Sequence, residues 1–381
     1  MTSKERVSVS LRGGMPDCIP IVPIYDAGYI CRATGADTRM WHLHSADDRI
    51  RMIEDSFLLH REIDGFFVHT GTSDEPSQYY DVERLDAYWL VTDTRTGERF
   101  GLLPDGSLCT AEGQSLSKQG GALGFESLIN SEDELDSLVD SLPTPESIDK
   151  IGYRPLRHLA AKYPDYHFSF QSGTPMVAAL SACGGFAEGL TLMATKPDVF
   201  TKLLERLTEH KCALLRPGRE AGADSVWFTC YYTGADTISP RDYADMIFPF
   251  EREICLEAKK QGLYVLNWYL GDLMPNLDQV MKLPIDALVL EQGRKGYEID
   301  PVAIRERVGP RFCLFGFGYE HDYCTCNRAG LTAELERQIS GAGADGAFVV
   351  GTPIMPPDAD PAAVDHYFSE ARRLTSRKDV P

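Results

Sequence analysis

The sequence has no apolar run long enough to cross a membrane. No hydrophobic stretch approaches the roughly 20 residues that a spanning helix needs, and Met1–Arg6 lacks the apolar segment of a signal peptide. Basic residues are few beside acidic ones, 38 against 57, which gives a net charge of −19. Because nucleic acid and anionic membranes are bound chiefly through Lys and Arg, we expect neither as a partner. The sequence predicts a cytoplasmic protein.

The cysteines form no CxxC pair, and no GxGxxG motif follows the first apolar run. The absence of GxGxxG argues against a dinucleotide-binding Rossmann fold. The ten cysteines are spread through apolar segments, and without a secretion signal we expect reduced thiols that pack as small hydrophobic side chains.

Short apolar runs recur eight times, and each is followed by a polar or Gly-rich break and then a helical pattern. Such uniformly apolar runs are typical of strands buried on both faces, as in an all-parallel sheet. The predicted strands are Ile19–Ile24, Gly65–Val68, His167–Phe170, Val226–Thr229, Leu263–Leu266, Ala287–Leu290, Phe312–Gly316 and Ala347–Val350. Eight such units predict an α/β protein with a (β/α)8 TIM barrel.

Helical patterns lie between these runs. The predicted helices include Asp47–Arg61, Pro197–Ala221, Pro240–Gln261, Leu331–Gly341 and Pro361–Arg373. Gly or Asp precedes several of the strands, as in Ala221–Ser225 and Ala342–Gly346, which is typical of the loops that join helices to strands in barrels.

One stretch interrupts the pattern. Residues 78–109 alternate polar and apolar side chains around the turn signals Asp93–Gly97 and Pro104–Gly106, which predicts a β-hairpin insertion after strand two, placed at the rim or as a lid. The acidic segment Ser131–Ser147 is predicted as a surface helix and linker. We expect one barrel domain over residues 1–381 that carries this insertion.

In a barrel of this kind the reacting groups lie just past the carboxyl ends of the strands. Three residues at such positions are candidates for acid–base catalysis: His69, Asp272 and Glu291. The candidates for substrate binding are Asp26, Gln171, Tyr231, Tyr232, Asn267, Trp268, Tyr269, Tyr319 and His321. We expect all of them to face one shared cleft.

Structural roles are the alternatives for several of these residues. Asp272 lies near Pro275 and can cap the next helix, and Tyr231 and Tyr232 can pack without a chemical role. Asn267 can hydrogen-bond to neighbouring strand ends. For Glu291 a functional role is the favoured interpretation. It directly follows an apolar strand, and a buried carboxylate without a partner would be costly there.

His321, Cys324 and Cys326 resemble a soft-metal cluster. Their spacing is not a standard zinc pattern, and no second Cys or His pair lies nearby, so no metal site is predicted.

Several motifs, in order along nearly the whole chain, resemble the uroporphyrinogen decarboxylase-like superfamily. They are Thr2–Val7 through Gly13 with Pro16–Ile21, Ser172–Pro175, Ser239–Tyr243 with Ile247–Phe250, and Gly351–Asp358. The superfamily divides into decarboxylases and methyltransferases, many of which work with a corrinoid protein.

The chain departs from two branches of that superfamily. The decarboxylases carry an Arg-rich first loop that grips the carboxylates of a tetrapyrrole, whereas Tyr25–Arg32 holds one Arg and one acid. The thiol-directed methyltransferases bind zinc through His-x-Cys and a later Cys, and the matching positions here are Asn267, Tyr269 and about Thr352. Zinc activation of a thiol is therefore not expected.

The resemblance that remains is to members that move a methyl group from a small methylated compound to a corrinoid protein. It implies a corrinoid-dependent methyltransferase for a methoxylated aromatic or a methylamine, with cobalamin carried by a partner protein. The aromatic candidates would suit such donors by stacking or cation–π contact. The alternatives are a decarboxylase-like lyase acting on a small carboxylic acid and a binding barrel without catalysis. A homodimer is one option for the assembly.

Overall fold

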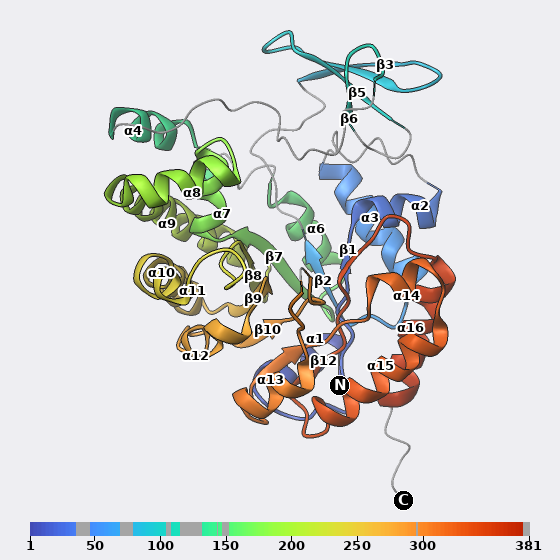
Figure 1. Ribbon diagram of the computed structural model, residues 1–381. Helices are drawn as coiled ribbons and strands as arrows, with labels where there is room; N and C mark the ends of the chain where they lie inside the picture. Colours follow the sequence, from blue (N-terminus) through green and yellow to red (C-terminus); the bar gives the residue numbers. More distant parts are fainter. Residues whose placement is uncertain are drawn as a thin grey trace, which may run out of the picture.

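The computed structural model describes residues 1–35, 46–68, 79–103, 108–114, 132–142, 144–146, 152–294 and 296–375. A curled parallel sheet lies at the centre and helices pack around its outside (Figure 1). This arrangement confirms the predicted α/β barrel.

Seven strands share the central sheet, in the order β12-β11-β10-β9-β8-β7-β2, and all neighbours are parallel. They are β2 (Gly65–Val68), β7 (His167–Gly173), β8 (Ser225–Tyr231), β9 (Tyr264–Leu270), β10 (Ala287–Val289), β11 (Cys313–Phe315) and β12 (Phe348–Val349). Each overlaps one predicted strand, because only a strand buried on both faces tolerates a run without polar alternation.

The segment that follows the N-terminal helix connects the two edges of this sheet. The Val22 N–H donates to the Val350 carbonyl at 2.9 Å, and the Asp64 N–H, next to β2, donates to the Ile21 carbonyl at 2.7 Å. Residues 20–22 therefore lie between β12 and β2 and close the barrel.

The first strand is less regular than predicted. Regular pairing is limited to β1 (Ile24–Tyr25), which runs parallel to β13 (Ile354–Met355), while Ile21 forms a single bridge to Val350. Pro20 and Pro23 have no N–H to donate, which interrupts the ladder.

Alternation along the strands separates two apolar layers. The barrel interior holds Phe67, Trp227, Trp268, Val289 and Phe315 among others, and Val7 and Leu11 of α1 (Ser3–Leu11) pack on the same cluster. The larger cluster lies between the sheet and the surrounding helices. The interior is therefore a packed core rather than a channel, as in other barrels of this kind.

The helices outside the sheet follow the strands in sequence. Their bounds are α2 (Ala27–Thr34), α3 (Ala46–Leu59), α4 (Glu132–Ser141), α6 (Arg154–Lys162), α7 (Pro175–Ala182), α8 (Phe186–Thr195), α9 (Pro197–Glu220), α12 (Leu277–Val280), α13 (Pro301–Val308), α14 (Glu320–Cys324), α15 (Arg328–Gly341) and α16 (Pro361–Thr375), with a 3-10 turn, η4, at Met274–Asn276. Within the described segments no single helix is long and apolar enough to span a membrane, and the bent pair α7 and α8 reaches the required length and hydropathy only when both are counted together.

The single helix predicted over Pro240–Gln261 is divided into three parts. A short α10 (Pro240–Asp242) leads into a π-helical turn, η3 (Tyr243–Ile247), and then into α11 (Phe248–Lys260). Pro249 lacks the N–H that a continuous α-helix would use at this point, which favours the wider turn.

The predicted insertion is an antiparallel sheet of four strands beyond the end of β2 (Figure 1). The strands are β3 (Tyr80–Arg84), β4 (Trp89–Asp93), β5 (Arg99–Leu102) and β6 (Leu108–Cys109). Trp89, Val91 and Leu102 form its own small core. Of the predicted range 78–109, residues 78 and 104–107 lie outside the described segments.

An ionic cluster ties the chain ends to the amino-terminal side of the sheet. Asp64 is 1% exposed and accepts hydrogen bonds from the Ile21 N–H at 2.9 Å, from Arg6 at 3.2 Å and from Arg372 at 2.7 Å. Arg6 lies on α1 and Arg372 on α16, so one carboxylate joins the first and last helices to the barrel.

Candidate active site

The candidate site is built from inward-facing residues at the carboxyl ends of β8, β9 and β10. Residues two apart on a strand share a face, so Tyr231 follows the interior residue Trp227, and Glu291 follows the interior residue Val289. Trp268 of β9 lies between them, in the interior cluster. The same rule that buries the barrel core therefore places a phenol, an indole and a carboxyl together.

Glu291 is the ionisable group at the centre of this site. It is 3% exposed, and the Trp268 indole N–H donates to its Oε2 at 3.2 Å. Its second oxygen, Oε1, has no hydrogen-bond partner within the described segments. Burial raises the pKa of Glu291 to about 8, against the opposing effects of Arg294, the Trp268 hydrogen bond and the backbone N–H of Ile354. The carboxyl is therefore mainly protonated at neutral pH and can donate a proton.

Aromatic rings surround this acid. The Tyr231 ring lies 6.0 Å from that of Trp268, and Trp268 lies 4.9 Å from Trp227, which in turn contacts Phe67 at 4.8 Å. Burial, and then the negative charge of Glu291, raise the pKa of Tyr231 to about 12, so the phenol stays neutral. Trp227 and Trp268 are 0% and 1% exposed and belong to the packed core beneath Glu291, while Tyr231 keeps part-exposed surface and forms an aromatic wall beside the proton donor.

A charged pair borders the site. Arg294, in the loop after β10, is hydrogen-bonded and ion-paired to Glu320 of α14. The Glu320 N–H donates to Gln292 Oε1 at 2.9 Å, which links the loops that follow β10 and β11. Sequence reasoning missed Arg294, because it lies in an irregular loop where no strand or helix period marks its direction.

Gln171 is also held at this end of the sheet. Its Nε2 donates to Thr229 Oγ1 of the neighbouring strand at 3.1 Å. Thr229 lies two residues before Tyr231 and so shares its inward face.

Asn267 and Tyr269 lie on the opposite face of β9 from Trp268. The Tyr269 hydroxyl donates to the Thr233 carbonyl at 2.8 Å and packs in the outer layer, and Asn267 is hydrogen-bonded to the buried thiol of Cys230. Because side chains alternate along a strand, Trp268 and its two neighbours cannot face the same cleft. The structure therefore does not bring Asn267 and Tyr269 to Glu291.

Two predicted carboxylates lie elsewhere on the same rim. Asp26 caps α2 by accepting from the Gly28 N–H at 2.7 Å, and burial raises its pKa. Asp272 does not cap η4, whose N-cap position is Leu273. It is placed next to Asp236, which accepts from the Asp272 N–H at 2.8 Å. Within the described segments neither carboxylate makes a hydrogen bond or ion pair with Glu291, and His69 lies outside those segments.

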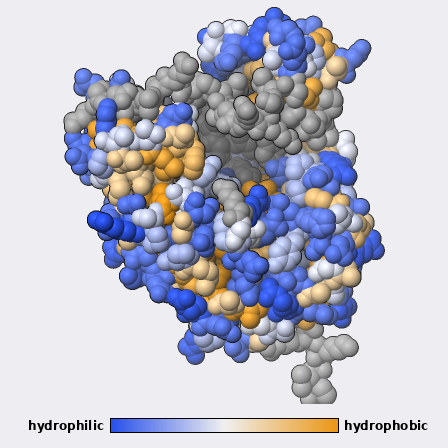
Figure 2. Space-filling model, viewed as in Figure 1, coloured by the Kyte–Doolittle hydropathy of each residue, from blue (hydrophilic) through white to orange (hydrophobic). Residues whose placement is uncertain are grey.

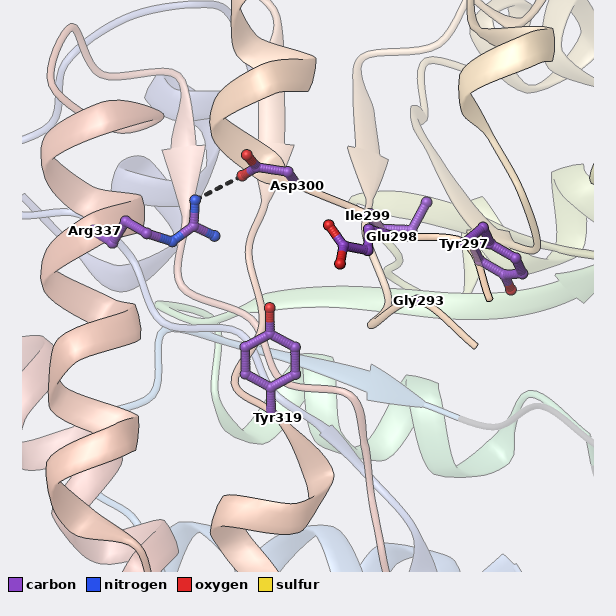
Figure 3. A pocket seen from close by; sticks show the side chains of 7 residues that line it. All are labelled: Gly293, Tyr297, Glu298, Ile299, Asp300, Tyr319 and Arg337. Carbon is purple, nitrogen blue, oxygen red and sulfur yellow. Dashed lines mark hydrogen bonds and ion pairs between the residues drawn. The ribbon is translucent and has the colours of Figure 1, made fainter. Parts of the chain in front are cut away.

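Tyr319 lines a polar pocket of about 420 Å³ that is separate from the aromatic wall. Its hydroxyl points toward the side chains of Asp300 and Glu298, and Arg337 is paired with Asp300 at 2.7 Å (Figure 3). His321 lies in an adjoining pocket of about 610 Å³, together with Tyr319. These two predicted residues therefore do not complete the site around Glu291.

Tyr232 faces outward at the rim. It has φ 66°, a left-handed conformation that side chains rarely adopt, and its ring lies 4.9 Å from that of Phe186 at the start of α8. Tyr232 and Phe186 are 40% and 44% exposed, and apolar surface gathers over α7 and α8 (Figure 2).

In the described segments, no three His, Cys, Asp or Glu side chains lie together in a way that could hold a metal ion. Cys324 instead lies 3.4 Å from Asp358, and burial raises the pKa of its thiol to about 11. All ten cysteines are free thiols.

Comparison with known proteins agrees with the fold and with the resemblance found in the sequence. In solved structures, a methyltransferase from Methanosarcina mazei superposes with a TM-score of 0.68 at 14% identity, over 98% of this chain and 99% of that one. A curated uroporphyrinogen decarboxylase from Roseiflexus sp. (strain RS-1) is 34% identical over 135 residues. That match spans 32% of this chain and 37% of the relative's length.

The family comparison covers more of the chain. The profile of the uroporphyrinogen decarboxylase (URO-D) family matches residues 128–374, from the segment before α4 to the last turn of α16. The matched region includes β8 and β9, which carry Tyr231 and Trp268, and the segment after β10 that carries Glu291. The chain belongs to the uroporphyrinogen decarboxylase family.

Proposed function

We propose that the protein is a methyltransferase that takes a methyl group from a small methylated compound, with Glu291 as its general acid. The observation that carries the proposal is a carboxyl group held protonated at neutral pH beside an aromatic wall. When a methyl group leaves a neutral donor such as an aryl methyl ether, the electron pair stays on the heteroatom, and the resulting anion needs a proton.

In the proposed reaction, the residues of the site have separate roles. Glu291 gives its proton to the leaving heteroatom as the bond between that atom and the methyl carbon breaks, and solvent reprotonates the carboxylate afterwards. The Trp268 N–H holds Oε2, so the unpartnered Oε1 is the oxygen that can carry the proton. Tyr231, which keeps part-exposed surface, packs against the donor by stacking with a methoxylated ring, whose phenolate needs the proton. A cationic methylamine would be held by cation–π contact and would leave as a neutral amine without that proton.

The proposed methyl acceptor is a corrinoid carried by a partner protein, which would supply a cobalt nucleophile. The exposed rings of Phe186 and Tyr232 are an apolar surface at the rim where such a partner can dock. This chain would contribute the acid, the ring of Tyr231 and the docking surface.

The loop after β1 favours this function over decarboxylation of a tetrapyrrole. Its one arginine, Arg32, lies on α2 and donates to the Pro357 carbonyl at 3.3 Å, and its acid, Asp26, is used as a helix cap. A substrate with several carboxylates would therefore meet one cation in this loop instead of a cluster.

A decarboxylase-like lyase that acts on a small carboxylic acid is the second candidate. The family profile and the Roseiflexus relative favour it, and protonation of the carbanion left by loss of carbon dioxide also needs an acid such as Glu291. The two functions differ in their products.

The decisive experiment is a screen of methoxylated aromatics and methylamines with reduced cobalamin under anaerobic conditions. Methyl transfer is followed by the absorbance change of the corrinoid, and carbon dioxide release from small acids is measured in parallel. Methylated cobalamin that depends on the wild-type protein and is lost with Glu291→Gln supports the proposal. Carbon dioxide release without corrinoid, and no methylation with any donor or with a cognate corrinoid protein, overturns it.

A further inference from the structure

Two side chains of opposite charge act on the carboxyl of Glu291. Arg294, three residues further along the loop after β10, supplies the cation, and Glu320, the first residue of α14, supplies the anion. Three uncharged groups also lie beside this carboxyl: the Trp268 indole on β9, the Tyr231 phenol on β8 and the backbone N–H of Ile354 on β13. The positions of Arg294 and Glu320 therefore decide the sign of the charge that the carboxyl meets.

The guanidinium of Arg294 is held by Glu320. Its Nη2 donates to Glu320 Oε1, and the two side chains are 52% and 29% exposed. Glu320 is itself fixed at the start of α14, because its backbone N–H donates to Gln292 Oε1 at 2.9 Å. Glu291 Oε1, in contrast, has no hydrogen-bond partner within the described segments. The cation of the loop is thus paired at the rim and not with the buried acid.

The turn that carries Arg294 is tightly packed. A Cβ built on Gly293 would lie 2.2 Å from the carbonyl oxygen of Tyr297, so this position requires glycine. The Tyr297 N–H donates to the Arg294 carbonyl at 3.3 Å and holds the backbone of the turn. Because the backbone is fixed, the direction of the long Arg294 side chain depends mainly on the group that accepts from its guanidinium.

A guanidinium close to a carboxyl group favours the ionised form, and a second carboxylate disfavours it. The charge of Arg294 lowers the pKa of Glu291 and the charge of Glu320 raises it, while burial has the largest effect. If Arg294 were free to approach the unpartnered Oε1, the resulting ion pair would stabilise the carboxylate. Glu291 would then lose the proton that a general acid needs.

We propose that Glu320 is a positioning residue of the site, which holds the Arg294 guanidinium at the rim and so keeps Glu291 in its acid form. The inference rests on the proposed function in one respect, because Glu291 is taken as the acid of the site. It adds a second role for the loop after β11, which would control the proton of a residue that follows β10.

The test is a titration of Glu291 in the full-length protein, without methyl donor or corrinoid. Carbon-13 NMR of protein labelled at the glutamate carboxyl carbons follows the signal that is missing in Glu291→Gln. Glu320→Ala removes both the charge and the oxygen that accepts from Arg294, and Arg294→Gln removes the cation. Both side chains are part-exposed, so these variants and the double variant should fold. Asp278→Asn is the matched control, because it frees Arg307, a 48% exposed arginine in the last turn of α13.

The proposal expects the titration midpoint of Glu291 to fall in Glu320→Ala, from about 8 in the wild-type protein by about one pH unit. The midpoint should rise in Arg294→Gln and stay unchanged in Asp278→Asn. In the Arg294→Gln background, Glu320→Ala should have a smaller effect, because only the loss of its own charge remains.

Two outcomes overturn the proposal: an unmoved midpoint in a folded Glu320→Ala protein, and an equal fall with and without Arg294. The second would mean that Glu320 acts by its own charge and does not position the guanidinium. Since the titration needs no donor and no corrinoid, a failure to methylate cobalamin would refute the proposed reaction and leave this result standing.

Discussion

Replacement of Glu291 by Gln tests whether this carboxyl is protonated in the folded protein. Gln keeps the shape of the side chain and can still accept the Trp268 hydrogen bond, but it cannot give a proton to a leaving group. If Glu291 is the general acid, the rate of methyl transfer falls by about 10²- to 10⁴-fold. In the wild-type protein the rate should be flat below a pH of about 8 and decline above it, because the acid form is lost there.

The same substitution has a defined effect on stability. The folded-state pKa of Glu291 is about 8 and the unfolded value is near 4.5, so between these pH values the folded protein binds the extra proton. Stability contributed by this group is therefore complete at low pH and is lost as the pH rises. At about 1.4 kcal/mol per pH unit, the wild-type protein loses up to about 4 kcal/mol between pH 5 and pH 9 through this carboxyl. Gln does not ionise, so the variant does not lose stability with pH at this position.

The assay is denaturant unfolding of the wild-type protein and Glu291→Gln at pH 5, 7 and 9. As the pH rises, the free energy of unfolding of Glu291→Gln should increase relative to that of the wild-type protein. Glu251 is also buried with a raised pKa of about 7, but it is present in both proteins and cancels in the comparison. Glu205→Gln, at an exposed position of α9, is the control. A difference between wild type and Glu291→Gln that stays constant from pH 5 to pH 9 would refute the reasoning.

Three further substitutions test other parts of the structure. Trp268→Phe removes a hydrogen bond that favours the Glu291 anion, so the alkaline decline of the rate should move to higher pH, and an unmoved decline contradicts this role. Asp64→Asn leaves Arg6 and Arg372 without their buried partner and should lower the free energy of unfolding by about 3 kcal/mol, against less than about 1 kcal/mol for the half-exposed Asp17→Asn. Phe186→Ser should raise the KM for the corrinoid protein, measured from initial rates. Leu256→Ser, at a similarly exposed position of α11, is the control and should leave this KM unchanged. Equal effects of the two substitutions would argue against docking at the rim.

Much of the fold could be predicted because a strand that is buried on both faces appears in the sequence as a short, continuous apolar run. Seven apolar runs became the strands of the sheet, since only a covered parallel sheet stabilises short runs such as Ala287–Val289. The first run was harder to interpret, because Pro20 and Pro23 fit the apolar pattern but cannot donate to a ladder. The predicted helix at Pro240–Gln261 had the right location, yet the pattern gave no warning of the π-helical turn.

The sequence by itself determined that Glu291 stands at the end of a buried strand, because its place after an apolar run is a local property. Tertiary structure decided which candidates meet. Because side chains alternate along β9, Asn267 and Tyr269 lie on the opposite face from Trp268, and Asp26 is used as the N-cap of α2. It also decided the chemistry of the site, because a pKa depends on the atoms that surround a carboxyl in space.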